Sequence, residues 1–277
     1  MTKITAQEVN NLRKITGAGM MDCKKALVEA EGNVETAIEI LRKKGQKVAN
    51  KRADKEASEG IVIAKTAEGN QFGVVFKLSC ETDFVAKNQD FVDFANRLMD
   101  LAMTHKPADI EAFNALSMED HTVAEHITEM IGKTGEKMAL EQYEMLEAAH
   151  VASYNHNGNK LACLLGMNKE VDDVAKIGHE IAMQVAAMAP VAVDESGIPQ
   201  EVIDKELEIA KDLIRQEGKP ENMVEKIAQG KLGRFFKENT LLNQVFVRDG
   251  KKTVAQYLKE CDPDLTVTAF HRVMLGE

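Results

Sequence analysis

Few residues in this sequence of 277 have the types and spacing that catalysis needs. No G-x-x-x-x-G-K-S/T segment is present, so the phosphate-binding loop formed by that motif is not expected. Residues 17–19 (Gly-Ala-Gly) follow a predicted helix instead of a strand, which argues against dinucleotide binding. His179 lacks a second histidine one turn later, and His121 and His126 are not expected on one helix face. The sequence predicts no catalytic residue, no metal site and no cofactor.

The four cysteines lie far apart and form no C-x-x-C pair; they are Cys23, Cys80, Cys163 and Cys261. A disulfide framework is therefore not expected, and a zinc ribbon is excluded. We expect small buried thiols in a reducing compartment. A thiol centre that pairs Cys80 with a histidine through space stays open, although no neighbour of Cys80 favours it.

One segment, 80–88 (CETDFVAKN), combines an aromatic side chain with flanking charges where a predicted hairpin meets a predicted helix. Phe84 has two interpretations. It could fill the protein's own core while Thr82 or Asp83 caps the helix. Alternatively, it is an aromatic wedge presented to a partner, because a few aromatic anchors carry most of the energy of an interface. The pattern alone leaves both interpretations open.

The elements that would position this segment begin with three helices in residues 1–45. Thr5 and Glu8 have the spacing of a capping box, and the first helix ends at Gly17. Asp22 is expected to cap a second helix, 23–30, and Asn33 a third one that runs up to Gly45. Because short amphipathic helices must bury their stripes against one another, we predict a three-helix bundle that resembles the ubiquitin-associated (UBA) type.

Basic residues dominate the stretch after the bundle, at Lys43, Lys44, Lys47, Lys51, Arg52 and Lys55. A nucleic-acid patch, a solvated linker and an exposed helix are all compatible with this pattern. The acidic remainder of the chain favours the last two, and we place a basic linker at 46–59.

Beyond residue 60 the same order of elements occurs twice. Strand patterns at 61–64 and 73–78 form a predicted hairpin, followed by a helix with Phe91 and Phe94 on its apolar face. A second hairpin at 151–154 and 161–165 precedes a helix at 171–188. The fold class is therefore α+β, with core subdomains at 60–140 and 141–277.

An inserted segment at 199–237 differs from its surroundings. Ile203, Leu207, Ala210 and Ile214 predict a helix whose apolar seam continues at Met223 and Ile227 on a returning helix. We predict an antiparallel coiled-coil hairpin there. Further strands are expected at 244–247 and 265–273.

The composition narrows the function. Acidic residues outnumber basic ones 45 to 35, for a formal net charge of -10, which argues against a general nucleic-acid binder. The N-terminus lacks the apolar stretch of a signal peptide, and no apolar run is long enough for a membrane helix. We therefore predict a cytoplasmic protein that binds a partner protein, with no direct contact to nucleic acid or membrane.

Two long segments resemble a known family. Residues 12–27 (LRKITGAGMMDCKKAL) are similar to the first signature of bacterial translation elongation factor Ts, and residues 82–88 (TDFVAKN) are similar to its second signature. The two occur in the expected order, and the resemblance extends over essentially the whole chain.

The resemblance implies a guanine nucleotide exchange factor for elongation factor Tu and no enzyme activity. It implies that Thr82, Asp83, Phe84 and Val85 act beside the nucleotide site, where Phe84 enters an apolar pocket and Mg²⁺ is displaced. It also implies partner contacts at Arg13, Met20 and Met21, and at His156 in the turn of the second hairpin. An assembly with two copies of each chain is compatible with it. Two other interpretations stay open from the residues alone, namely an adaptor that binds helices or ubiquitin-like proteins without exchange activity, and an enzyme with a thiol or carboxylate site.

Overall fold

A computed structural model describes residues 4–277, and it confirms the predicted α+β class. Three sheets are present among these residues, with strand orders β1-β2-β5, β3-β4 and β6-β7-β8. The chain divides into two compact units. Unit 1 comprises residues 1–63, 76–144 and 273–277, and unit 2 comprises residues 64–75 and 145–272. The four-part division drawn from the sequence stays a prediction.

Three helices form the N-terminal bundle in unit 1: α1 (Ala6–Thr16), α2 (Met20–Glu29) and α3 (Val34–Arg52). Their buried side chains, among them Leu12, Cys23 and Leu27, form a separate hydrophobic cluster. The Thr5 capping box is confirmed, as is the Asn33 cap.

Two details of the predicted bundle are wrong. Gly19, not Asp22, is the N-cap of α2, because the helix begins at Met20 and Asp22 lies in its first turn, where it pairs with Lys44. The third helix does not end at Gly45 but continues to Arg52, through the first part of the predicted linker. A Cβ atom on Gly45 would lie 3.0 Å from the carbonyl oxygen of Thr128. This glycine therefore permits close packing of two helices and does not end one.

The first predicted hairpin is confirmed as strands β1 (Glu59–Thr66) and β2 (Phe72–Cys80), of which residues 59–63 and 76–80 belong to unit 1. The predicted helix that follows is α5 (Gln89–His105), and its side chains Phe91, Phe94 and Leu98 are buried. Elements that the sequence analysis did not predict complete this region: α6 (Ile110–Ala115), β3 (Ser117–Met118), β4 (His121–Thr122), α7 (Val123–Thr134) and β5 (Met138–Glu147). β5 runs across residue 140, at which the sequence analysis divided the core.

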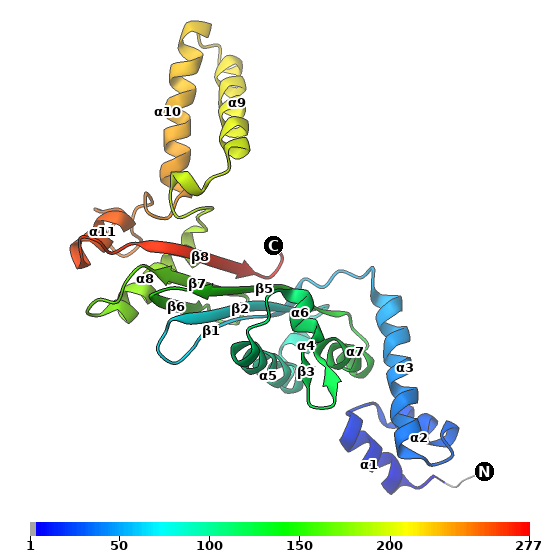
Figure 1. The fold of residues 1–277 in the computed structure, drawn as a ribbon. Helices are drawn as coiled ribbons and strands as arrows, with labels where there is room; N and C mark the ends of the chain where they lie inside the picture. Colours follow the sequence, from blue (N-terminus) through cyan, green and yellow to red (C-terminus); the bar gives the residue numbers. More distant parts are fainter. Residues whose placement is uncertain (1–3) are drawn as a thin grey trace. The chain divides into compact units, whose positions relative to one another are not determined.

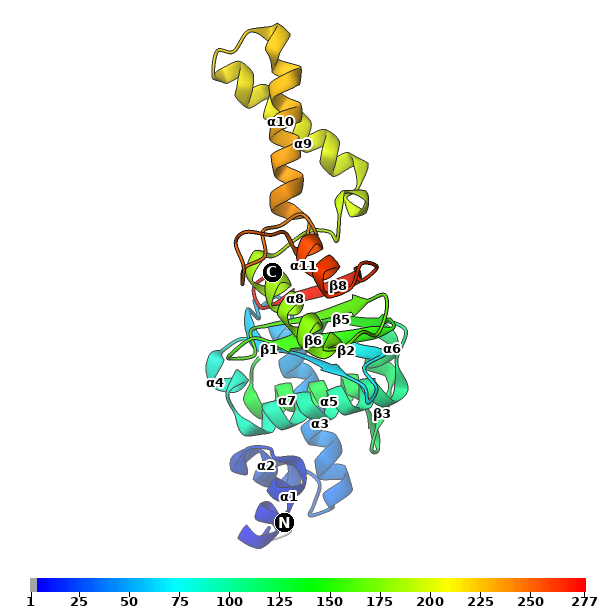
Figure 2. The same ribbon diagram turned by 90° about the vertical axis from the view of Figure 1, so that its left-hand side faces the viewer.

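Unit 2 contains the second predicted hairpin, whose strands β6 (His150–Asn155) and β7 (Leu161–Met167) pair antiparallel. β8 (Val267–Met274) continues this sheet beside β7. The helix α8 (Val174–Met188) packs on β6 and β7, as Figure 2 shows, and buries a large apolar cluster with them. α8 begins three residues later than predicted, after Asp173, which has a left-handed backbone (φ 59°).

The inserted hairpin is confirmed as α9 (Gln200–Gln216) and α10 (Glu221–Asn239), which pack on each other and extend from the rest of unit 2 (Figures 1 and 2). Ala210 and Ile214 are buried against Val224 and Ala228. Met223 is exposed, so its predicted place in the seam is wrong. The neighbouring Val224 is buried in that place, and Ile227 packs against the seam as predicted.

Residues 244–247 do not form the predicted strand. Val245 makes one isolated bridge to Thr253, and Phe246 stacks on Tyr257 with ring centroids 4.3 Å apart. Tyr257 lies on α11 (Val254–Cys261), a helix that the sequence analysis missed. Phe246 therefore packs on a helix, whereas Val245 and Val247 are exposed. No helix within residues 4–277 is long and apolar enough to cross a membrane.

Candidate functional site

The segment around Phe84 rests on a dense set of hydrogen bonds. The Thr82 backbone N–H and hydroxyl donate to the two carboxylate oxygens of Glu136, at 3.0 and 2.7 Å. The Thr82 hydroxyl oxygen accepts from the backbone N–H of Val85, at 3.4 Å, and caps the short helix α4 (Asp83–Ala86). Of the two caps considered from the sequence, Thr82 is the one that forms, on α4, whereas the long helix α5 is capped by Asn88. The backbone before Phe84 is fixed by a carboxylate that lies 54 residues further along the chain.

Glu81 connects the same segment to two other elements of unit 1. Its carboxylate accepts from the guanidinium of Arg52 at the end of α3, at 2.7 Å, and from the backbone N–H of Lys137, at 2.6 Å. The Lys137 ammonium in turn donates to the backbone carbonyls of Ala53 and Lys55, at 2.9 Å each. The backbone just before the Phe84 segment is therefore held in place by hydrogen bonds to the end of α3 and to Lys137.

Phe84 itself points away from this base, with 84% of its surface exposed. The interpretation in which it fills the protein's own core is therefore wrong. Asp83 beside it pairs with Lys87 one turn later, at 2.6 Å. The hydrogen bond from Lys87 to Asp83 raises the pKa of Lys87. Exposure of an aromatic ring to water is unfavourable, and burial of the Phe84 ring against a partner protein would remove this cost.

The bundle presents a second exposed apolar group. Met20 and Met21 begin α2 and are 56% and 63% exposed, and Ile15 near the end of α1 is similarly exposed. Arg13 is exposed on α1, and its carbonyl accepts from the N–H of Gly17, at 2.8 Å, where the chain turns with a left-handed backbone. The three predicted contact residues therefore lie on the two helices that this turn connects. Flexible methionine side chains suit such a contact because they adapt to irregular surfaces.

The third predicted contact, His156, lies in the β6–β7 turn of unit 2 and is exposed. Its Nδ1 atom is 2.9 Å from the hydroxyl oxygen of Tyr154. Thr82, Asp83, Phe84 and Val85 form one continuous site in unit 1, whereas His156 belongs to unit 2 and is a separate feature.

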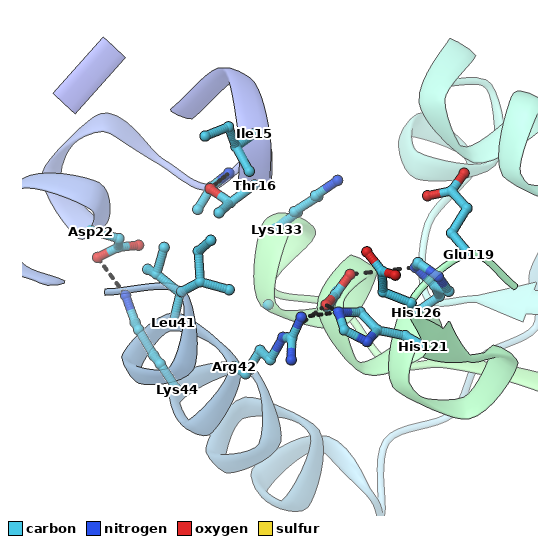
Figure 3. Close-up of a pocket in the computed structure, with 16 residues that line it drawn as sticks. Ile15, Thr16, Asp22, Leu41, Arg42, Lys44, Glu119, His121, His126 and Lys133 are labelled. Carbon is cyan, nitrogen blue, oxygen red and sulfur yellow. Dashed lines mark hydrogen bonds and ion pairs between the residues drawn. The ribbon is translucent and has the colours of Figure 1, made fainter. Parts of the chain in front are cut away.

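A cavity of about 300 Å³ separates the bundle from α7 and the β3–β4 turn within unit 1 (Figure 3). Glu129 is its central carboxylate, 3.2 Å from Arg42 Nε, 3.7 Å from His121 Nε2 and 3.4 Å from His126 Nδ1. The two histidines do not share a helix face, as the sequence predicted, but their rings lie 5.6 Å apart. His121 reaches this place from β4, outside the helix that carries His126. Figure 3 shows this network joining α3 to α7.

The cysteines do not form a nucleophilic site. Burial raises the pKa of Cys80 and of Cys163 to about 12, so neither thiol ionises near neutral pH. Cys23 is also buried, and Cys261 is exposed with a pKa that burial raises as well. Across residues 4–277, no group of three or more His, Cys, Asp or Glu side chains is arranged to hold a metal ion.

Sequence reasoning missed the residues that anchor the segment, chiefly Glu81, Glu136 and Lys137. Charged residues are common on any surface, and no local pattern marks the ones that pair across 50 residues. Thr82 was found because a cap is a local signal, and Glu136 was missed because its contact is not local.

Comparison with known proteins gives consistent matches. A family model described as "Elongation factor TS" matches residues 81–277. A protein named elongation factor Ts from Christiangramia forsetii is 54% identical over 276 residues, which cover 100% of both chains. The protein of that name from Flavobacterium psychrophilum is 50% identical, again over 100% of both chains. One from Porphyromonas gingivalis is 48% identical over 99% of this chain and 98% of its own.

Proposed function

Because this chain belongs to the elongation factor Ts family, and so is a nucleotide exchange factor for elongation factor Tu in translation elongation, we propose that residues 82–85 drive the exchange step. Members of this family are exchange factors of the bacterial cytoplasm and not catalytic enzymes. The proposal assigns to Phe84 the part of a wedge that enters an apolar pocket of the GTPase and dislocates its Mg²⁺. The observation that carries it is the exposure of Phe84 on an anchored base.

Exchange needs no catalytic group in this chain. A factor that binds the nucleotide-free GTPase more tightly than the GDP-bound one weakens GDP binding by the same ratio, because coupling between two sites is reciprocal. Burial of one phenylalanine contributes about 1.5–3 kcal/mol, or roughly 10- to 100-fold in an equilibrium constant. An acceleration of GDP release beyond about 100-fold therefore requires free-energy contributions other than the burial of Phe84.

Loss of Mg²⁺ is a large local term of this kind. The ion neutralises the diphosphate, so its removal leaves GDP with uncompensated charge in the site. Asp83, next to the wedge, adds a carboxylate at the place where this charge balance is disturbed. The rigid anchoring of Thr82 lowers the entropic cost of insertion, since the wedge is ordered before it binds.

Two further contacts complete the proposal. Arg13, Met20 and Met21 on the bundle hold the GTPase domain of the partner, and His156 binds another domain of it. An assembly with two copies of each chain is the larger form that we propose for the complex, and light scattering on the purified complex would measure its mass.

The decisive experiment measures release of a fluorescent GDP from elongation factor Tu. Phe84→Ala should slow release at saturating factor by about 10-fold or more, since burial of one phenylalanine is lost. The free variant should keep its midpoint of thermal unfolding, because Phe84 is exposed. Val191→Ala, a change at another exposed apolar residue, is the matched control and should leave release unchanged.

A second arm repeats the measurement after Mg²⁺ has been removed with EDTA. If the wedge acts by dislocating the ion, the defect of Phe84→Ala should shrink there, whereas a Met20→Ala, Met21→Ala variant should keep its defect. Equal defects of Phe84→Ala with and without Mg²⁺ would refute dislocation. Normal exchange by Phe84→Ala would refute the wedge itself.

A further inference from the structure

His156 lies in a turn whose backbone is held by several hydrogen bonds. The preceding Asn155 side chain bonds the backbone of Ala64 twice, accepting from its N–H at 2.7 Å and donating to its carbonyl at 2.8 Å. The N–H of His156 donates to the carbonyl of Leu161, at 2.9 Å, and its carbonyl accepts from Asn159, at 3.1 Å. The Cα position of His156 is therefore fixed within unit 2.

The imidazole is held as well, by Tyr154. The Tyr154 hydroxyl lies 2.9 Å from His156 Nδ1, and the two rings have centroids 5.9 Å apart. The Tyr154 ring packs partly on the apolar cluster of unit 2, and His179 on α8 meets it edge-on at 5.5 Å. Tyr154 thus has an apolar ring packed against the core and a hydroxyl that reaches an exposed histidine.

We propose that Tyr154 is a positioning residue for His156. It selects the tautomer and ring orientation in which Nε2–H points outward, as a donor to an acceptor oxygen on elongation factor Tu. This inference rests on the proposed contact of His156 with that partner.

The direction of the hydrogen bond follows from the chemistry of the two groups. A phenol is a better donor than acceptor because its oxygen lone pair is delocalised into the ring, and neutral imidazole has one strong acceptor nitrogen. Donation from Tyr154 to Nδ1 therefore leaves the proton of neutral imidazole on Nε2. A solvated histidine without this bond would sample both tautomers and several rotamers, and binding would have to select one of them.

The size of the effect follows from that selection. Ordering one side chain at an interface costs about 0.5–1.5 kcal/mol, which corresponds to about 2- to 10-fold in affinity. Tyr154→Phe removes only the hydroxyl and keeps the ring on the core, so the fold should be unaffected. We expect this variant to bind nucleotide-free elongation factor Tu about 2- to 10-fold more weakly.

A double-mutant cycle separates positioning from direct contact. His156→Ala should weaken binding by itself, and Tyr154→Phe should add nothing in the His156→Ala background. His156→Gln, whose amide nitrogen replaces Nε2 as a donor, should retain more affinity than His156→Asn, whose amide lies at the Nδ1 position. Additive effects of Tyr154→Phe and His156→Ala would overturn the inference.

The tautomer can be read directly in the free protein. Imidazole ¹⁵N chemical shifts at about pH 8, above the ordinary histidine pKa of about 6.5, should show protonated Nε2 in His156, and a mixture in Tyr154→Phe. Protonated Nδ1 in the natural protein would overturn the inference, even if His156→Ala weakens binding. Unchanged binding by His156→Ala would instead remove the proposed partner contact of His156, and the inference with it, while the wedge would stand.

Discussion

At the scale of single residues, the wedge depends on a carboxylate that never touches it. Glu136 accepts both hydrogen bonds that hold Thr82, and Thr82 starts the helix turn that carries Phe84. The ring can enter a pocket only along the direction in which its base is fixed. The position of Phe84 therefore depends on Glu136, through Thr82.

Glu136→Ala should therefore slow nucleotide exchange although the partner does not need to meet this residue. Two hydrogen bonds to a charged group are lost, each worth about 1.5–3 kcal/mol, so we expect the α4 turn to lose at least about 1.5 kcal/mol of stabilisation. The measurement is GDP release, with Glu208→Ala on α9 as an exposed control. In a Phe84→Ala background, Glu136→Ala should have no further effect. An equal slowing in both backgrounds would show that Glu136 acts elsewhere.

Thiol chemistry gives a second prediction at this scale. Burial raises the pKa of Cys80 and Cys163 to about 12, so at about pH 8 only about one thiol in 10⁴ is ionised at either position. A thiolate-specific reagent should therefore modify Cys261 first and the buried cysteines only when the protein unfolds. Cys261→Ser should abolish the early phase. Rapid modification of Cys80 in that variant would contradict the burial argument.

At the scale of elements, the crossing of α3 and α7 joins the bundle to the core of unit 1. Gly45 faces Gly132 there, and a Cβ on Gly132 would lie 3.0 Å from the Cα of Gly45. The pair Arg42–Glu129 lies beside the same crossing. Helix α3 is therefore at once the last helix of the bundle and a packing surface of the core.

Gly45→Val should separate these two roles. The new side chain overlaps the backbone of α7, and overpacking of this kind costs about 1–3 kcal/mol. Gly230→Val on α10 is the matched control, because a Cβ at Gly230 meets no atom within 4 Å. Denaturant titration should show a loss of stability for Gly45→Val beyond that of the control. Equal free energies of unfolding for the two variants would show that α3 and α7 can move apart to accept the new side chain without loss of stability.

The elements also show what local sequence can predict. The first hairpin, α5 and the inserted hairpin were predicted because their apolar residues recur at regular spacing. β5 was missed because its buried side chains, at Met138, Leu140, Tyr143 and Leu146, do not alternate along the strand. The end of α3 was misplaced because a glycine that permits close packing reads like a glycine that ends a helix. At the candidate site, the exposure of Phe84 could not be settled from the pattern, since burial depends on residues distant in sequence.

At the scale of the whole molecule, the bundle supplies a partner contact of its own. The buried side chains of the bundle form a cluster of their own. The proposed contact residues Arg13, Met20 and Met21 all lie on its helices α1 and α2. The helix bounds also change where it should be cut, because removal of residues 1–45 would divide α3.

Deletion of residues 1–52 should leave a folded remainder that exchanges nucleotide poorly. We expect at least about 10-fold weaker binding to elongation factor Tu, since several apolar side chains leave the interface. Circular dichroism and GDP release measure the two parts of this prediction. The triple variant Arg13→Ala, Met20→Ala, Met21→Ala in the full chain keeps the packing of α3 on α7 and the Arg52–Glu81 pair, so its loss measures the partner contact alone. Exchange at the natural rate by the truncated chain would contradict the assignment.

The α9–α10 hairpin offers the experimenter a place to attach a reporter. Its arms bury Ala210, Ile214, Val224 and Ala228 against each other, so the tip carries little of the fold. Lys219 at that tip is exposed. A fluorophore could be attached at Lys219→Cys in a chain that also carries Cys261→Ser. This position lies at the tip of the α9–α10 hairpin, more than 100 residues from Phe84 in the sequence. Energy transfer to a labelled GTPase would then time the arrival and departure of the factor in single encounters.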